Sequence, residues 1–179
     1  MIIFEQQKAG KMVTILLIAL TIVQFVYYEP ILPDQIASHF NLKGQPDNWS
    51  SKRVVLFTHL GLILFFALVF QFAGWLTCKI PEALINLPHK SYWLAAERKQ
   101  QTLNSIATFL IWIGNVSIVF FVVIFNLIYQ ANLTSNPRTA NFWFTLIIFL
   151  LAIGYMVFFF FKRFYNIPLH DRRRYRLSQ

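Results

Sequence analysis

The chain alternates long apolar runs with shorter polar segments. Four runs approach or exceed the ~20 apolar residues that a helix needs to cross a hydrocarbon core of ~30 Å. They cover about residues 12–28, 54–76, 105–129 and 142–161, and none of them contains Asp, Glu, Lys or Arg. Each run can therefore satisfy its backbone as a helix in lipid without burying a full charge. The pattern predicts an all-α membrane protein, a four-helix antiparallel transmembrane bundle.

The segment between the first two runs, residues 29–53, predicts a structured outer loop. Prolines break the helix at its start, and Gly, Pro, Asp and Asn mark turns near residues 44–48. Between them, residues 34–40 are expected to form a turn or two of helix. Because the segment is too short for a core of its own, it is expected to lie on the helices.

The remaining polar segments complete a single transmembrane domain over residues 1–179. Residues 77–104 predict an elbow, in which Ser91 caps a helix that begins near Tyr92 and runs unbroken into the third span. Residues 162–179 form a basic tail.

Composition and charge agree with this class and give the chain an orientation. The chain is 57% hydrophobic and only 13% charged, with a net charge of +9. Twelve of the sixteen Lys and Arg residues lie in the two terminal segments and the elbow, which predicts that both termini are cytoplasmic. This topology accounts for the positive charge without a nucleic-acid partner. The basic tail is expected to contact anionic lipids, at about 1 kcal/mol per residue.

Two lines of polar residues run along the predicted spans. Asn104, Asn115 and Asn126 recur at intervals of eleven residues, which returns to nearly the same face of a helix. The first span carries a similar line within an arc of about 80°, made of Thr14, Thr21, Gln24 and Tyr28. We expect the two lines to face each other, because unpaired amides are costly in lipid. Ile111 and Ile118 are expected to face lipid instead.

Several polar residues of the spans lie in the outer half, directly below the outer loop: Gln24, Thr58, His59, Asn126 and Thr145. They predict a shallow polar pocket capped by that loop. His59 is open to two interpretations. It is either an interior hydrogen-bonding residue or a functional residue that carries protons or acts as a ligand. The second is considered because an ionisable residue within a span is a functional candidate.

The two most specific segments resemble the SdpI-like family of small bacterial membrane proteins, whose N-terminal loop region is known as domain of unknown function 1648. The outer loop carries LPDQIASHFN at residues 32–41, GQPDNW at 44–49 and SK at 51–52. The elbow carries NLPHKSYWL at residues 86–94, similar to an Asn-to-Tyr-Trp stretch of that family.

The resemblance and the pocket together nominate two sets of residues. The binding set combines the loop motif with the polar residues below it: Pro33, Asp34, His39, Phe40, Asn41, Gly44, Pro46, Asp47, Trp49, Lys52, Gln24, His59 and Asn126. The elbow set follows the second motif: Asn86, Pro88, Tyr92, Trp93 and Arg98.

The best-known members of the resembled family are immunity proteins that protect a producing bacterium from its own secreted peptide toxin. Longer members have helices that this chain lacks. The resemblance therefore implies a non-enzymatic protein of the bacterial cytoplasmic (inner) membrane that recognises a peptide toxin or a membrane protein partner through its outer loop.

The sequence gives less support to other functions. It has no nucleophile and base in a catalytic pattern, no Gly-rich phosphate loop and no carboxylate pair inside the membrane, so no enzyme is expected. Asp34, His39 and Asp47 share the loop without a zinc spacing, so neither metal nor cofactor is expected. A small transporter or channel subunit with a polar pathway between helices is one alternative. An accessory subunit that packs against a larger complex is another, and the oligomeric state is left open.

Overall fold

The structure is a computed structural model that describes residues 2–139, 141–169 and 171, with side chains from Glu5 onward. The described chain is mostly helical, with one small sheet. Its elements follow in the order α1 (Ile2–Tyr28), β1 (Gln35–Phe40), β2 (Pro46–Ser51), α2 (Lys52–Thr77), η1 (Glu82–Leu84), α3 (Lys90–Trp93), α4 (Ala96–Asn132) and α5 (Phe142–Tyr165). Among the described elements, α1, α2, α4 and α5 are long and apolar enough to cross a membrane.

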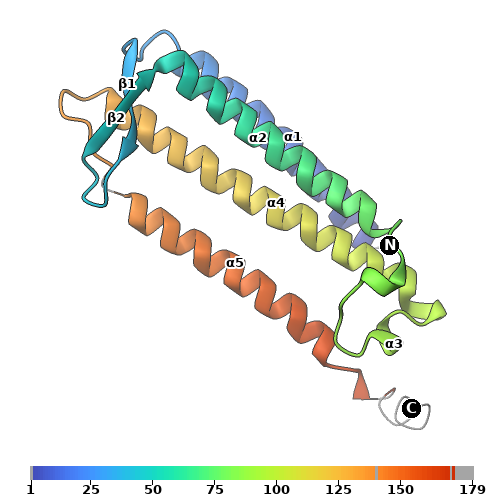
Figure 1. The fold of residues 1–179 in the computed structure, drawn as a ribbon. Coiled ribbons are helices and arrows are strands. Elements are labelled where there is room, and N and C mark those ends of the chain that lie inside the picture. The colour runs from blue at the N-terminus through green and yellow to red at the C-terminus, as the bar shows by residue number, and fades with distance from the viewer. Residues whose placement is uncertain (1, 140, 170, 172–179) are drawn as a thin grey trace.

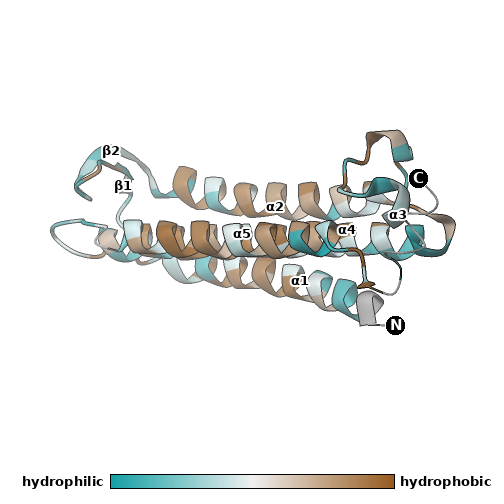
Figure 2. Ribbon diagram, turned by 90° about the horizontal axis from the view of Figure 1, so that it is seen from below, coloured by the Kyte–Doolittle hydropathy of each residue, from teal (hydrophilic) through white to brown (hydrophobic). Residues whose placement is uncertain are grey.

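The long helices lie side by side with α4 at the centre, in contact with α1, α2 and α5 (Figure 1). The strands β1 and β2 lie at one end, which we call the hairpin end. The short helix α3 lies at the other, which we call the elbow end. Apolar residues dominate the middle of the long helices, and polar residues gather towards both ends (Figure 2).

The four spans predicted from the sequence all lie within long helices, but α1 begins earlier than expected. Helix α1 begins at Ile2 rather than near residue 12, and α4 begins at Ala96, ahead of the third span. Neither extension contains proline. Hydropathy marks the stretch that fits in lipid and does not mark where the hydrogen-bonded helix stops, so the predicted spans were too short.

The expected helical turn at residues 34–40 was wrong, because this segment forms strand β1. Strand β1 pairs antiparallel with β2, with Gln35 opposite Ser51 and Phe40 opposite Pro46. The turn between them is closed by Asn41, whose Oδ1 accepts from two backbone N–H groups that follow. Pairing across the turn satisfies the backbone over a longer stretch than an isolated helical turn could.

The elbow also differs from the prediction. Helix α3 ends at Trp93 and α4 begins at Ala96, so no unbroken helix leads from Tyr92 into the third span. The residue preceding α3 is His89, in a left-handed conformation with φ of 51°, rather than Ser91. Thr102 donates its hydroxyl to the Trp93 carbonyl at 2.8 Å, which satisfies one of the carbonyls freed by the break.

The two polar lines do face each other, as predicted. Thr14 donates to Asn115 Oδ1 at 2.7 Å in the buried middle of the helices. Nearer the hairpin end, Asn126 Oδ1 accepts from the Tyr28 hydroxyl at 2.8 Å and from Gln24 Nε2 at 3.4 Å. These pairs join α1 to α4 by interhelical hydrogen bonds, which in membranes contribute about 0.6–2 kcal/mol each.

Ile111 and Ile118 were wrongly expected to face lipid. Their exposed fractions are 3% and 1%. The expectation assumed that only the asparagine face of α4 is covered. Because α4 lies between α1, α2 and α5, most of its circumference is buried, and lipid-facing positions on it are few.

A candidate binding pocket at the hairpin end

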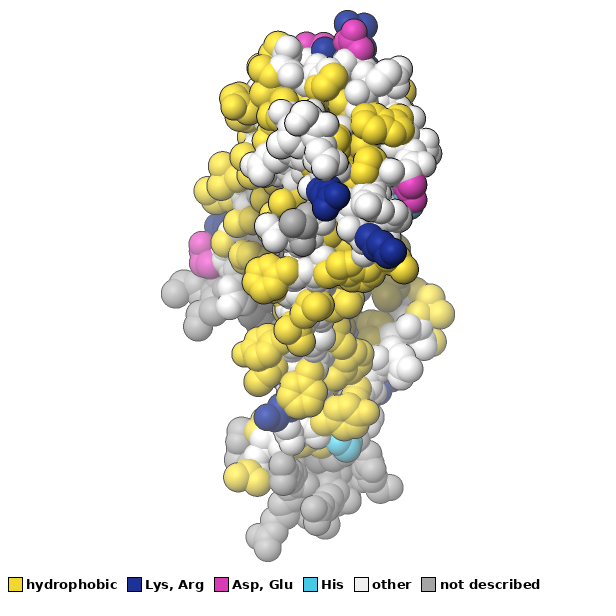
Figure 3. All heavy atoms as spheres, turned by 90° about the vertical axis from the view of Figure 1, so that its left-hand side faces the viewer, with side chains coloured by type: hydrophobic (Ala, Val, Ile, Leu, Met, Phe, Trp, Pro, Cys, Tyr) yellow, Lys and Arg dark blue, Asp and Glu magenta, His cyan; other side chains and the backbone are white. Residues whose placement is uncertain are grey.

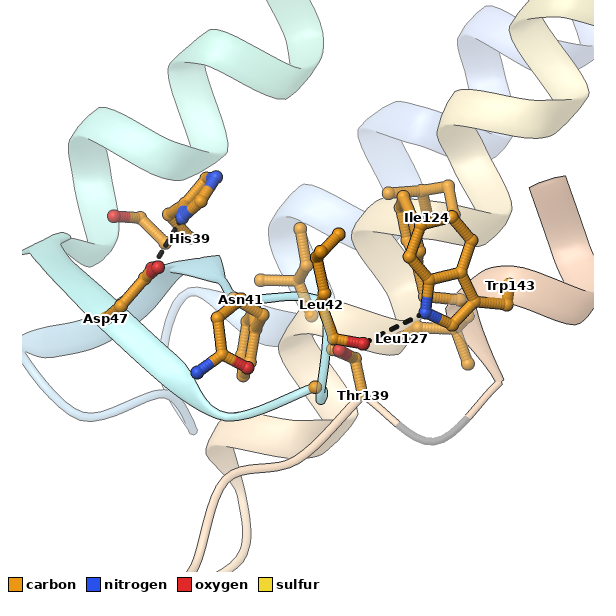
Figure 4. A pocket seen from close by; sticks show the side chains of 13 residues that line it. His39, Asn41, Leu42, Asp47, Ile124, Leu127, Thr139 and Trp143 are labelled. Atoms are coloured by element: carbon orange, nitrogen blue, oxygen red, sulfur yellow. Dashed lines mark hydrogen bonds and ion pairs between the residues drawn. The ribbon is translucent and has the colours of Figure 1, made fainter.

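The hairpin, the end of α4 and the start of α5 enclose a pocket of about 530 Å³ (Figure 4). The hairpin contributes Ser38, His39, Phe40, Asn41, Leu42, Gly44 and Asp47. The helices and the loop between them contribute Ile124, Leu127, Ile128, Thr139, Phe142 and Trp143. A pocket of this size fits a small molecule or a few side chains of a peptide.

The pocket has one polar and one apolar side. On the polar side, His39 Nδ1 lies 2.5 Å from Asp47 Oδ1, and both side chains remain accessible. The two residues come from neighbouring strands, close to the His39–Asn48 pair of the register. On the apolar side, Ile124, Leu127 and Trp143 face the hairpin from α4 and α5 (Figure 4). The arrangement suits a ligand that is itself amphipathic.

Asn132, at the end of α4, holds the hairpin in place. Its Oδ1 accepts from the Ala37 N–H at 2.7 Å, and its Nδ2 donates to the Ala37 carbonyl at 2.9 Å. The side-chain amide thus pairs with β1 as a third strand would. Both residues are buried, together with the adjacent Ile36, so the pairing groups are shielded from water and the hairpin is fixed relative to α4.

A second attachment joins the hairpin turn to the segment before α5. Trp143 Nε1 donates to the Leu42 carbonyl at 3.1 Å, and Thr139 N donates to the Gly44 carbonyl at 3.2 Å. Gly44 has φ of +72°, and a Cβ there would lie 3.0 Å from the Thr139 carbonyl oxygen. Glycine is therefore required at this position both by its conformation and by the close approach.

Of the loop residues nominated from the sequence, five line the pocket: His39, Phe40, Asn41, Gly44 and Asp47. Lys52 instead fixes the base of the hairpin, because its Nζ donates to the Leu32 carbonyl at 3.2 Å and pairs with Asp34 at 3.4 Å. Pro33, Pro46 and Trp49 do not line it.

Gln24, His59 and Asn126 do not line this pocket, so the shallow polar pocket expected among them stays a prediction. His59 is 1% exposed, stacks on Phe125 with ring centroids 4.2 Å apart, and shares a hydrogen bond of 3.0 Å with Tyr129. Within the described residues, His59 Nε2 and Gln24 Oε1 are buried without a hydrogen-bond partner.

At the elbow end, Trp93 contacts the last turn of α5, Tyr92 contacts Asp171 beyond that helix, and Arg98 contacts Tyr92. The Tyr92 hydroxyl donates to Asp171 Oδ2 at 2.6 Å, and Trp93 Nε1 donates to the Phe164 carbonyl at 2.8 Å. The Arg98 guanidinium lies 4.1 Å from the centroid of the Tyr92 ring. Burial raises the pKa of Tyr92, the hydrogen bond and charge of Asp171 raise it further, and Arg98 lowers it. Tyr92 is thus held as a neutral donor.

The other elbow residues lie on a shallow cavity of about 420 Å³, where Asn86 and Pro88 face Phe161 and Tyr165. Lys162 and Arg163 of the basic tail lie in the last turn of α5. The other four arginines of the tail fall in residues 172–179, outside the described residues. The contact of the tail with anionic lipids stays a prediction.

The residues that sequence reasoning missed are Ser38 and Leu42 of the hairpin, Asn132, and those that α4, α5 and the loop between them contribute to the pocket. Asn132 carried one signal, since it is a polar residue at the end of an apolar span. The apolar lining residues carried none, because Ile124 and Leu127 look like any other residue of a span.

Comparisons with known proteins cover only part of the chain. A family model described as Domain of unknown function (DUF1648) matches residues 16–64. The match spans the second half of α1, the whole hairpin and the first half of α2, in agreement with the domain expected from the outer loop. No curated protein and no solved structure matches the chain.

Proposed function

We propose that this chain is a non-enzymatic protein of the bacterial inner membrane, of the SdpI-like type, that recognises a peptide or another membrane component at the hairpin end. In this proposal the long helices form an antiparallel transmembrane bundle, both termini are cytoplasmic and the hairpin end faces outward. The observation that carries the proposal is the pocket of about 530 Å³ beneath the hairpin.

The pocket is preorganised for binding. Asn132, Trp143 and Thr139 attach the hairpin to the helices by hydrogen bonds. The hairpin therefore needs little further ordering when a ligand binds, which lowers the entropic cost of association. The accessible His39–Asp47 pair supplies polar recognition, and the apolar side supplies burial. Convergent polar groups beside an apolar wall are the common form of a ligand site.

The matched family and the charge distribution support the same assignment. The matched segment contains the polar side of the pocket, which agrees with recognition by the outer loop. The excess of Lys and Arg at the termini and elbow favours a cytoplasmic position for that end, and the hairpin end would then be exposed to molecules outside the cell.

A deletion strain tests this function. We expect it to be hypersensitive to a secreted membrane-active peptide, and the wild-type protein should restore resistance. Leu127→Trp, which fills the pocket, and Asp47→Ala, which removes its carboxylate, should fail to restore it. Leu150→Trp is the matched control, because Leu150 is 57% exposed on α5 and does not line the pocket.

Two results would replace the proposal. Unchanged sensitivity in the deletion strain, with native purification in a stable larger complex, would assign the accessory role. A proton or solute flux in liposomes that His59→Phe abolishes would assign the transporter role. It would also explain the buried His59 Nε2, which has no hydrogen-bond partner.

A further inference from the structure

Apart from His39, the formal charge that lines the pocket has one sign. Among its lining residues, Asp47 is the acidic residue, and neither Lys nor Arg is present. Three aromatic side chains, Phe40, Phe142 and Trp143, also line it. A carboxylate opposite an apolar, partly aromatic wall suits an organic cation that carries an apolar chain, because charge attraction holds the cation and burial holds the chain.

We propose that the pocket binds an ammonium group carried on an apolar chain. The inference rests on the proposed function and names the chemistry of its ligand. The ammonium would lie against Asp47, and the apolar chain would lie along Ile124, Leu127 and Trp143, on the opposite side of the pocket (Figure 4). Both a lysine-bearing peptide and a free alkylammonium compound present this chemistry.

The His39–Asp47 contact helps to define the site. It engages Asp47 Oδ1, so the second carboxylate oxygen remains for a ligand. Asp47 is also accessible, with 43% of its side chain exposed, and a ligand reaches it without first breaking a buried ion pair. A cation in direct contact with this carboxylate gains most of its selectivity from that one charge.

Two cations near the pocket act against such a ligand. Lys43 and Arg138 are exposed neighbours in sequence of the lining residues Leu42, Gly44 and Thr139, but they do not line the pocket. At physiological salt the screening length is about 8 Å, so their repulsion is weakened more than the contact attraction of Asp47. Selectivity for the ammonium should therefore persist at physiological ionic strength.

The experiment uses the full chain, labelled with 5-fluorotryptophan, in a non-ionic maltoside micelle that carries no ammonium group. The probe is hexyltrimethylammonium, and hexanoate is its matched anion. We expect the ammonium probe to shift the fluorine resonance of Trp143 saturably, with assignment by Trp143→Phe, and hexanoate to leave it in place. Asp47→Asn should weaken binding at least tenfold. Glu29→Gln, which removes an acid paired with Arg53 away from the pocket, should not.

An equal shift with hexanoate, or unchanged affinity in Asp47→Asn, would overturn this inference. If Leu127→Trp still abolished peptide resistance in that case, the proposed function would stand with a different ligand chemistry. A short Lys-Leu peptide and its fully acetylated form separate the two sources. Competition by the free peptide alone supports a peptide ligand, and no competition by either supports a free alkylammonium ligand.

Discussion

A single side chain, that of Asn132, determines where the hairpin lies. A two-stranded hairpin is marginally stable by itself, and its exposed strand edges leave backbone groups to be satisfied by other means. Asn132 meets both requirements at once through its paired bonds to Ala37. It also donates to the Ile128 carbonyl at 2.9 Å, which fixes its own orientation.

Replacing Asn132 by Leu should therefore release β1. The change leaves the N–H and carbonyl of Ala37 buried without partners, at a cost of about 1–3 kcal/mol for each group. We expect faster hydrogen exchange at Ile36 to Phe40, measured by mass spectrometry, while α4 keeps its protection. Asn136→Leu, an exposed change in the following loop, should leave the exchange of β1 unchanged. Equal protection of β1 in Asn132→Leu would contradict the role of the amide.

The sequence predicts the environment of single residues well where they recur with a helical period. The asparagines of α4 were identified because they recur every eleven residues, and their partners on α1 followed from the same geometry. The burial of Ile111 and Ile118 was not predictable in this way. Whether an apolar residue meets lipid or another helix depends on which helices surround it, and its chemistry is the same in both cases.

At the scale of elements, α5 is held most specifically at its two ends. Along its length it packs chiefly against α4, where Phe109 stacks on Phe160 and Phe120 stacks on Phe149, with ring centroids 3.9 and 4.4 Å apart. At the elbow end, Trp93 Nε1 donates to the Phe164 carbonyl. The carbonyls of a last helical turn have no partner within the helix, so Trp93 satisfies one of them.

Trp93→Phe should loosen this end of α5. The substitution keeps an aromatic ring near Phe164 and removes the N–H donor, at a cost of about 0.5–1.5 kcal/mol. We expect faster hydrogen exchange near residues 160–165 and a lower melting temperature in detergent. Trp75→Phe is the matched control, because Trp75 is 58% exposed on α2, and it should change neither quantity. An identical effect of both variants would show that loss of the indole alone is responsible.

The predictability of each element follows from the range of the interactions that form it. The long helices were predicted because their hydrophobicity is a local property of the chain. The hairpin was mistaken for a helical turn because β1 depends on β2 and on Asn132, which lies 95 residues further along the chain. The same separation explains why lining residues could be named from the sequence on the hairpin side of the pocket and none on the side of α4 and α5.

At the scale of the whole molecule, the two ends differ in the charge they carry. The surface seen in Figure 3 shows acidic and basic side chains together with hydrophobic ones. Most Lys and Arg residues of the sequence belong to the termini and the elbow segment. This asymmetry is the basis for placing the hairpin end outside the cell.

Cysteine labelling in intact cells tests that orientation. In a Cys78→Ala background, an impermeant thiol reagent should label Lys43→Cys and Ser135→Cys but not Ala83→Cys, and all three should be labelled after permeabilisation. These positions are exposed. Ser51 is a poorer choice at the hairpin end, because its hydroxyl accepts from Val54 N as the cap of α2. Labelling of position 83 alone in intact cells would show that the predicted orientation is inverted.

The pocket is built from two stretches of chain that lie far apart in the sequence. Its charged side lies within the matched segment, residues 16–64, and its apolar side lies beyond residue 120. Chains that share the first stretch and differ in the second would keep the carboxylate that binds the charged group of a ligand. They would accept ligands whose apolar parts differ in length or shape. A chimaera that takes only the second stretch from another such chain should therefore acquire that chain's preference for ligand size. It should keep its own preference for ligand charge.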